Sequence, residues 1–209
     1  MPILREKLID CLQTMKEVYL ADPEGSVRSQ AFIKILHDYC VSELSNVGIT
    51  DGALAIKKEV TIYGSHKPKK VDVAIIEDNN GPQIIIGIRS QMSSVSKNIL
   101  TYYEEIIGDC ISLHDRFPMA VLCYVYLLPQ TIIKPGIDEN VNLERVERLL
   151  GRIAGRADWR DTKDKYEHIA FLKVEFLTDP PTLLKTIPLL DIENFFDNIV
   201  TTYNNRKPI

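Results

Sequence analysis

Two apolar runs joined by a short polar turn, residues 70–76 and 83–90, constrain the fold of this chain most strongly. The second run contains three consecutive isoleucines at residues 84–86. A strand with large apolar side chains on both faces is typical of the centre of a sheet. Asp72 stands near the start of the first run and Arg89 near the end of the second. Because adjacent strands of a hairpin run in opposite directions, we expect these two charged residues at one end of the strand pair.

The pattern on either side predicts a mixed α/β architecture. Apolar residues at helical spacing predict a helix at residues 3–20 and a second helix from Ser26 to about Gly48, and alternation predicts a strand at 53–63. The other expected elements are a helix capped by Ser94 or Ser96 that ends near Gly108, a strand at 119–128, a loop at 131–140, a helix at 141–154, a strand at 168–177 and a last helix capped by Asp191. The strand-helix-strand unit across 83–128 predicts parallel strands joined by a right-handed crossover. We therefore expect a mixed β-sheet with helices on its faces, and two helices before its first strand.

Composition indicates a single domain over residues 1–209. A chain of 209 residues with 45% hydrophobic residues can bury a sizeable core. No apolar run approaches the roughly 18–20 residues of a membrane span, and charged residues at 5–7 argue against a signal peptide. We therefore expect a cytoplasmic protein without a membrane partner. The four cysteines are widely spaced among apolar neighbours and are expected to be reduced core thiols: Cys11, Cys40, Cys110 and Cys123.

Asp72 and Arg89 suggest phosphodiester chemistry. Hydrolysis of a phosphodiester requires neutralisation of an anionic transition state and activation of a water, and a divalent metal held by carboxylates does both. Arg89 remains protonated, so it can bind a phosphate through its planar fork but cannot act as a general base. The alternative is structural, with Asp72 at an exposed strand end in a salt bridge with Lys70.

The stretch KKVDVAIIEDNNGPQIIIGIRSQMSSVSKNILTYYEEIIGD, Lys69 to Asp109, resembles the core of the PD-(D/E)xK nucleases, the superfamily of most type II restriction enzymes. The C-terminal segment IENFFDNIVTTYNNRKP is similar to the ends of such enzymes. The resemblance implies a restriction-endonuclease-like fold with Asp72 as principal metal ligand. The sequence departs from the motif at two positions: Gly87 stands where the second acidic residue is expected, and Arg89 replaces the lysine.

The same resemblance implies that a carboxylate on the next helix substitutes for the missing one. Glu104 and Glu105 are the candidates, and Glu104 is preferred slightly because it lies nearer in helical angle to the apolar seam. Glu59 and Glu77 remain competitors, and the pair at 104–105 could equally be a solvated surface. Gln91 could orient a water or contact DNA. The implied catalytic set is therefore Asp72, Arg89, Gln91 and Glu104, with Mg²⁺, or Mn²⁺ in its place, held by Asp72 and either Glu104 or Glu105.

The partner implied by the resemblance is double-stranded DNA, read by a symmetric homodimer if the target is palindromic. The expected DNA contacts are Lys57, Lys58, Lys69, Lys70, Ser90, Lys97 and Asn98. A second basic series would share one helical face, either as a phosphate-contacting stripe or as a solvated surface: Arg145, Arg148, Arg152 and Arg156. The net charge of −4 argues weakly against a nucleic-acid binder.

Two other function classes remain open. In the first, Gly87 and Arg89 mark an eroded catalytic set, and the protein binds DNA or a protein partner without cleavage. In the second, the chain is an α/β interaction domain with no nucleic-acid affinity. The four histidines show no metal-ligand spacing and are expected to be structural or exposed: His37, His66, His114 and His168.

Overall fold

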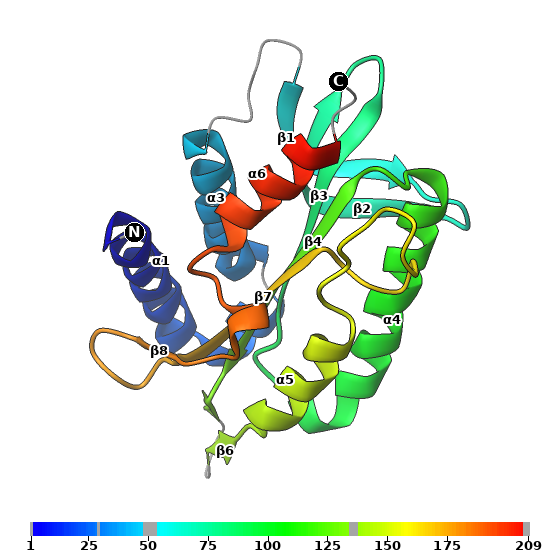
Figure 1. The fold of residues 1–209 in the computed structure, drawn as a ribbon. Helices are drawn as coiled ribbons and strands as arrows, with labels where there is room; N and C mark the ends of the chain where they lie inside the picture. The colour runs from blue at the N-terminus through cyan, green and yellow to red at the C-terminus, as the bar shows by residue number, and fades with distance from the viewer. Residues whose placement is uncertain (1, 29, 48–53, 134–137, 207–209) are drawn as a thin grey trace.

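A computed structural model describes residues 2–28, 30–47, 54–133 and 138–206. Its centre is a six-stranded sheet in the order β1-β2-β3-β4-β7-β8 (Figure 1). The strands are β1 (Leu54–Tyr63), β2 (Pro68–Glu77), β3 (Gly81–Ser90), β4 (Val121–Pro129), β7 (His168–Glu175) and β8 (Thr182–Leu184). The first three strands pair antiparallel, β3, β4 and β7 pair parallel, and β8 returns antiparallel. The expected mixed sheet and its parallel crossover are confirmed.

Helices cover both faces of the sheet (Figure 1). On one face lie α1 (Pro2–Ala21), the short α2 (Pro23–Arg28), α3 (Gln30–Asn46) and α6 (Phe195–Arg206). The other face carries α4 (Val95–Arg116) and α5 (Leu143–Arg152). Each face buries its own apolar cluster, because the central strands alternate apolar side chains to both sides. The isoleucine run of β3 follows this rule: Ile84 and Ile86 pack toward α1 and α3, and Ile85 packs toward α4.

Several predicted element ends were wrong. Helix α4 continues past Gly108 to Arg116, because its apolar face continues with Cys110 and Leu113, which are buried in the core cluster on this side of the sheet. Ser26 lies inside α2 and its hydroxyl donates to the Val18 carbonyl, so it does not cap α3. The last helix begins at Phe195, and Asp191 follows a short 3-10 turn, Pro188–Leu190, instead of capping α6.

The expected loop at 131–140 contains strand in its described residues. Two short strands, β5 (Thr131–Ile132) and β6 (Glu139–Asn140), pair antiparallel in this segment. Ala53, the expected first residue of β1, lies outside the described residues. The expectation of reduced core thiols is confirmed, since all four cysteines are free and buried. None of the helices in the described parts of the chain combines the length and apolar composition of a transmembrane span.

Candidate functional site

The candidate site begins where β2 and β3 stop pairing. Their ladder ends at Val73 and Ile86, and the next residue of β2 toward its start is Asp72. Oδ2 of Asp72 accepts a hydrogen bond of 2.6 Å from the backbone N–H of Ile88 on β3. The carboxylate therefore replaces the ladder bond that β2 would otherwise supply, and it fixes the diverging ends of the two strands.

The other oxygen of this carboxylate faces a histidine of α3. His37 Nε2 lies 3.6 Å from Asp72 Oδ1, and the His37 side chain is 7% exposed. That nitrogen is buried and has no hydrogen-bond partner. Burial lowers the pKa of His37 more than the nearby carboxylate of Asp72 raises it, so the imidazole is neutral at pH 7. Burial also raises the pKa of Asp72, although the hydrogen bond from Ile88 and the nearby His37 oppose that shift.

Arg89 is held in place by α4. Its guanidinium lies 4.0 Å from the centroid of the Tyr102 ring, and Nη1 lies 3.3 Å from Oε2 of Glu105. Stacking and an ion pair together fix the planar fork on a side chain that is 31% exposed. Of the two predicted helix carboxylates, Glu105 is therefore the ion-pair partner of Arg89.

An aromatic ring fills the space beside Gly87, the position at which the resemblance implies an acidic residue. Gly87 is in register with Tyr124 of the parallel strand β4. A Cβ added at Gly87 would lie 2.6 Å from Cε2 and 2.7 Å from Cδ2 of that ring. The ring of Tyr166 packs edge-on against Tyr124 with centroids 5.5 Å apart, so the Tyr124 ring has little room to move aside. The Tyr124 ring of β4 therefore leaves no room for a side chain at residue 87.

Gln91 is buried in the loop that leads from β3 to α4. Its Oε1 accepts a 2.7 Å hydrogen bond from the Tyr126 hydroxyl, and its Nε2 donates to the carbonyls of Ser93 and Ser94. These bonds shape the loop and engage both ends of the amide. In the structure, Gln91 therefore stabilises the loop between β3 and α4, and its predicted role toward water or DNA stays a prediction.

Two cavities meet at Arg89. One, of about 220 Å³, is lined by Asp72, Lys69, Lys70 and Asp109 as well as Gly87 and Tyr124. The second, of about 340 Å³, is polar and is lined by Ser90, Ser94, Asn98 and Tyr102. Arg89 lines both cavities, so one guanidinium is available to groups in either. Glu104 and Glu105 line a different cavity, with His66 and Lys67, and the cavity at Asp72 is not lined by them.

Asp109 is the acidic residue that shares the cavity of Asp72, and the sequence interpretation missed it. It lies one turn after Glu105 on α4, at the spacing that puts two residues on one helical face. This spacing from Glu105 is the sequence signal that could have identified Asp109. The carboxylate of Asp109 forms an ion pair with Lys69. His37 was also missed, and no sequence signal joins it to Asp72, because the two meet only through the packing of α3 on the sheet.

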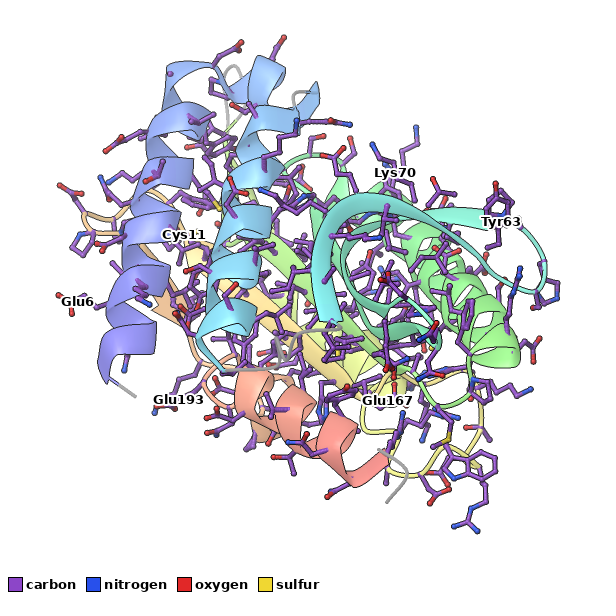
Figure 2. All side chains as sticks on the ribbon, turned by 90° about the horizontal axis from the view of Figure 1, so that it is seen from above. Glu6, Cys11, Tyr63, Lys70, Glu167 and Glu193 are labelled. Carbon is purple, nitrogen blue, oxygen red and sulfur yellow. The ribbon has the colours of Figure 1, made fainter. Side chains whose placement is uncertain are left out.

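Three of the five lysines predicted to bind DNA are engaged with carboxylates. Lys58 lies 2.6 Å from Asp38, and Lys69 pairs with Asp109. Lys70 lies 2.8 Å from Glu59, so the predicted alternative of a Lys70–Asp72 salt bridge is wrong. Figure 2 shows Lys70 at the β1–β2 hairpin, and its ammonium group pairs with Glu59 of β1. Lys57 is exposed on β1, and Lys97 and Asn98 lie in the first turn of α4.

The predicted arginine stripe divides into two parts. Arg145, Arg148 and Arg152 lie on α5, which ends at residue 152. Arg156 lies beyond the helix end, is buried, and donates a 2.6 Å hydrogen bond to Oε1 of Glu167. Arg156 is therefore not part of a surface stripe, because the chain turns inward after α5 to place its guanidinium beside Glu167.

Among the described residues, no three or more His, Cys, Asp or Glu side chains are grouped to hold a metal ion. Comparisons with protein-family models, curated proteins and solved structures found no match. The geometry around Asp72 and Arg89 is therefore the basis for a functional assignment.

Proposed function

We propose that this protein is a divalent-metal-dependent endonuclease of double-stranded DNA with a restriction-endonuclease-like fold. The observation that carries the proposal is the cavity of about 220 Å³ at the diverging ends of β2 and β3. Asp72, Lys69, Lys70 and Arg89 line it together. A carboxylate beside several cations suits a phosphodiester whose charge must be neutralised from both a metal and the protein.

The donor set at Asp72 fits a divalent ion held mainly by its substrate. Oδ2 is committed to the Ile88 N–H, and Oδ1 faces the unpartnered Nε2 of His37. Mg²⁺ and Mn²⁺ commonly take only one or two protein carboxylates and complete their shell with water and phosphate oxygens. When bound, such an ion would polarise the phosphoryl oxygens and lower the pKa of a water.

The protein side chains would position the phosphate. Arg89, fixed by Tyr102 and Glu105, would bind a phosphate oxygen through its fork. Lys69 and Lys70 would add positive charge, each after release from its present carboxylate partner. A homodimer would place two such sites on the two strands of a palindromic target.

The test compares Asp72→Asn with Asp78→Asn on large unmethylated DNA in Mg²⁺, in Mn²⁺ and in EDTA. The asparagine oxygen can still accept from Ile88, so the fold is retained while the negative charge is lost. We expect D72N to lose at least about 10²-fold in cleavage rate, the usual cost of removing one preorganised electrostatic partner. Asp78 is exposed in the β2–β3 turn, at the opposite end of the same hairpin, and D78N should cut like the wild type. Equal cutting by D72N and the wild type would exclude the proposal.

A second candidate function is DNA binding without cleavage. It is favoured by the Tyr124 ring at the position of the missing carboxylate and by the engagement of Glu105 with Arg89. In that case DNA binding, measured by gel shift, would be the same in EDTA and in Mg²⁺, and no cut product would form. Absence of both cutting and binding would leave the α/β interaction domain.

A further inference from the structure

His37 and Asp72 present a geometry that a direct hydrogen bond does not explain. Their facing atoms, Nε2 and Oδ1, are 3.6 Å apart, beyond the range of about 2.7–3.2 Å for a hydrogen bond of this type. A buried polar atom without a partner costs about 1–3 kcal/mol, so such an atom is normally satisfied. The Nε2 atom is aimed at a carboxylate that lines a solvent-accessible cavity. A ligand placed between the two atoms would satisfy both.

The separation matches two ligands of one tetrahedral metal ion. Zn²⁺ binds nitrogen and oxygen at about 2.0–2.2 Å, which puts two tetrahedral ligand atoms about 3.4 Å apart. Octahedral Mg²⁺, with bonds of about 2.0–2.1 Å, brings neighbouring ligand atoms to about 2.9 Å. Imidazole nitrogen is also a poor ligand for Mg²⁺ and a good one for transition metals.

The other carboxylates near the pair are already bound to lysines. Glu59 on β1 is the other nearby carboxylate, and it is held by Lys70 at 2.8 Å and Lys34 at 3.9 Å. Asp38, on the α3 turn after His37, pairs with Lys58 at 2.6 Å. Both carboxylates are thus neutralised by lysines, whereas Asp72 has no lysine partner among the described ion pairs.

We propose that His37 Nε2 and Asp72 Oδ1 are joint ligands of a single divalent transition-metal ion. Water or phosphate oxygens complete its coordination shell. The inference adds a second protein ligand and places a transition metal at Asp72 in place of Mg²⁺, and it rests on the proposed function only for the use of the ion in cleavage. Metal binding itself is independent of DNA.

The test is isothermal titration calorimetry of metal-free full-length protein with ZnCl₂ and CoCl₂, without DNA. We expect one site per chain, and intense visible absorption of bound Co²⁺ typical of tetrahedral coordination. His37→Gln and Asp72→Asn should each weaken binding by at least the roughly 10–100-fold that loss of an outer-shell partner costs. The matched controls are His66→Gln, in the exposed β1–β2 turn, and Asp38→Asn, and both should bind like the wild type. Unchanged affinity in H37Q would overturn the inference.

A second measurement needs no substitution and guards against misfolding of H37Q. In the wild type, Zn²⁺ should shift the imidazole ¹⁵N resonances of His37 and leave those of His66 unchanged. Shifts confined to His66 would overturn the inference.

The metal site and the nuclease activity can be disproved independently of each other. Zinc binding that depends on His37, without DNA cleavage in any metal, would retain this site and exclude the nuclease. Cleavage in Mg²⁺, with zinc affinity unchanged in H37Q, would retain the nuclease and exclude this site.

Discussion

At the residue scale, the contact between Gly87 and Tyr124 explains why residue 87 carries no side chain. The Tyr124 ring, packed against Tyr166, fills the space in which a side chain at residue 87 would lie. A carboxylate could therefore not be restored there by a single substitution.

We predict that Gly87→Ala destabilises the protein by about 1–3 kcal/mol, the usual cost of inserting a carbon into a packed core. In a Tyr124→Leu background the same change should cost less, with a coupling of about 0.5–3 kcal/mol, because the two residues are in contact. Urea unfolding of the four proteins measures this cycle. Gly108→Ala is the control, since its Cβ meets no atom within 4 Å, and it should stabilise α4 by about 0.5–1 kcal/mol. Additive effects at residues 87 and 124 would refute the argument.

At the scale of elements, Glu167 joins segments that are distant in the chain (Figure 2). It precedes β7, and its Oε2 accepts from the Leu122 N–H at 2.7 Å and lies 3.2 Å from Nε2 of His114 on α4. Its Oε1 accepts from Arg156 at 2.6 Å and lies 2.8 Å from Nη2 of Arg206 at the end of α6. One carboxylate therefore connects the sheet to helices on both of its faces.

We predict that Glu167→Gln destabilises the fold by about 3–5 kcal/mol, because it leaves two buried guanidinium groups without their counter-charge. Chemical denaturation at pH 7 measures the loss. Glu193→Gln serves as the control, since Glu193 is exposed in the turn before α6 and its replacement should change stability by less than about 0.5 kcal/mol. A loss in E167Q no larger than in E193Q would contradict this role.

The same carboxylate predicts an acid transition. Burial alone would raise the pKa of Glu167, but the hydrogen bond and charge of His114, the charge of Arg206 and the hydrogen bond from Arg156 outweigh it and lower the pKa to about 2. A depressed carboxyl pKa contributes stability above its unfolded value of 4.5, and that contribution is lost as pH falls from about 4.5 through about 2. The contribution of the ionised Glu167 carboxylate to the free energy of unfolding is on the order of 3 kcal/mol. Unfolding free energies between pH 7 and pH 2 should fall in this window, and E167Q should show a smaller fall.

At the scale of the whole molecule, the charge pattern sets how DNA would be bound. The net charge is −4, and Lys58, Lys69 and Lys70 are paired with carboxylates. These three lysines would meet a phosphate after their ion pairs open, whereas Lys57 is exposed on β1 at the sheet edge. This favours modest affinity that depends on salt.

We predict that Lys57→Gln weakens binding to any duplex and reduces the slope of log K against log salt concentration by about 1, the change expected for one lost phosphate contact. Fluorescence anisotropy with a short duplex at several salt concentrations measures the slope. Lys185→Gln is the matched control, because Lys185 is exposed just after β8 at the opposite edge of the sheet. Equal slopes for K57Q and the wild type would remove Lys57 from the interface.

The sequence by itself predicted the five longer strands of the sheet, but not β8, and it placed Asp72 and Arg89 at one end of the β2–β3 hairpin. The central position of β3 follows from the isoleucine run, and the hairpin from the two apolar runs and the polar turn between them. Periodicity is a local property, so it predicts strands, helices and the strand ends where charged groups gather. The element ends expected at Gly108 and Asp191 were wrong. A glycine or a capping residue ends or begins a helix only where the packing of the neighbouring elements also ends or begins it there.

Only the tertiary structure decided which side chains meet. His37 reaches Asp72 through the packing of α3 on the sheet, and Tyr124 fills the space at Gly87 through the parallel register of β3 and β4. Arg156 leaves the predicted stripe because Glu167 lies inside the fold. These contacts join residues that are far apart in the chain. They depend on packing in three dimensions, which the local spacing of residue types does not encode.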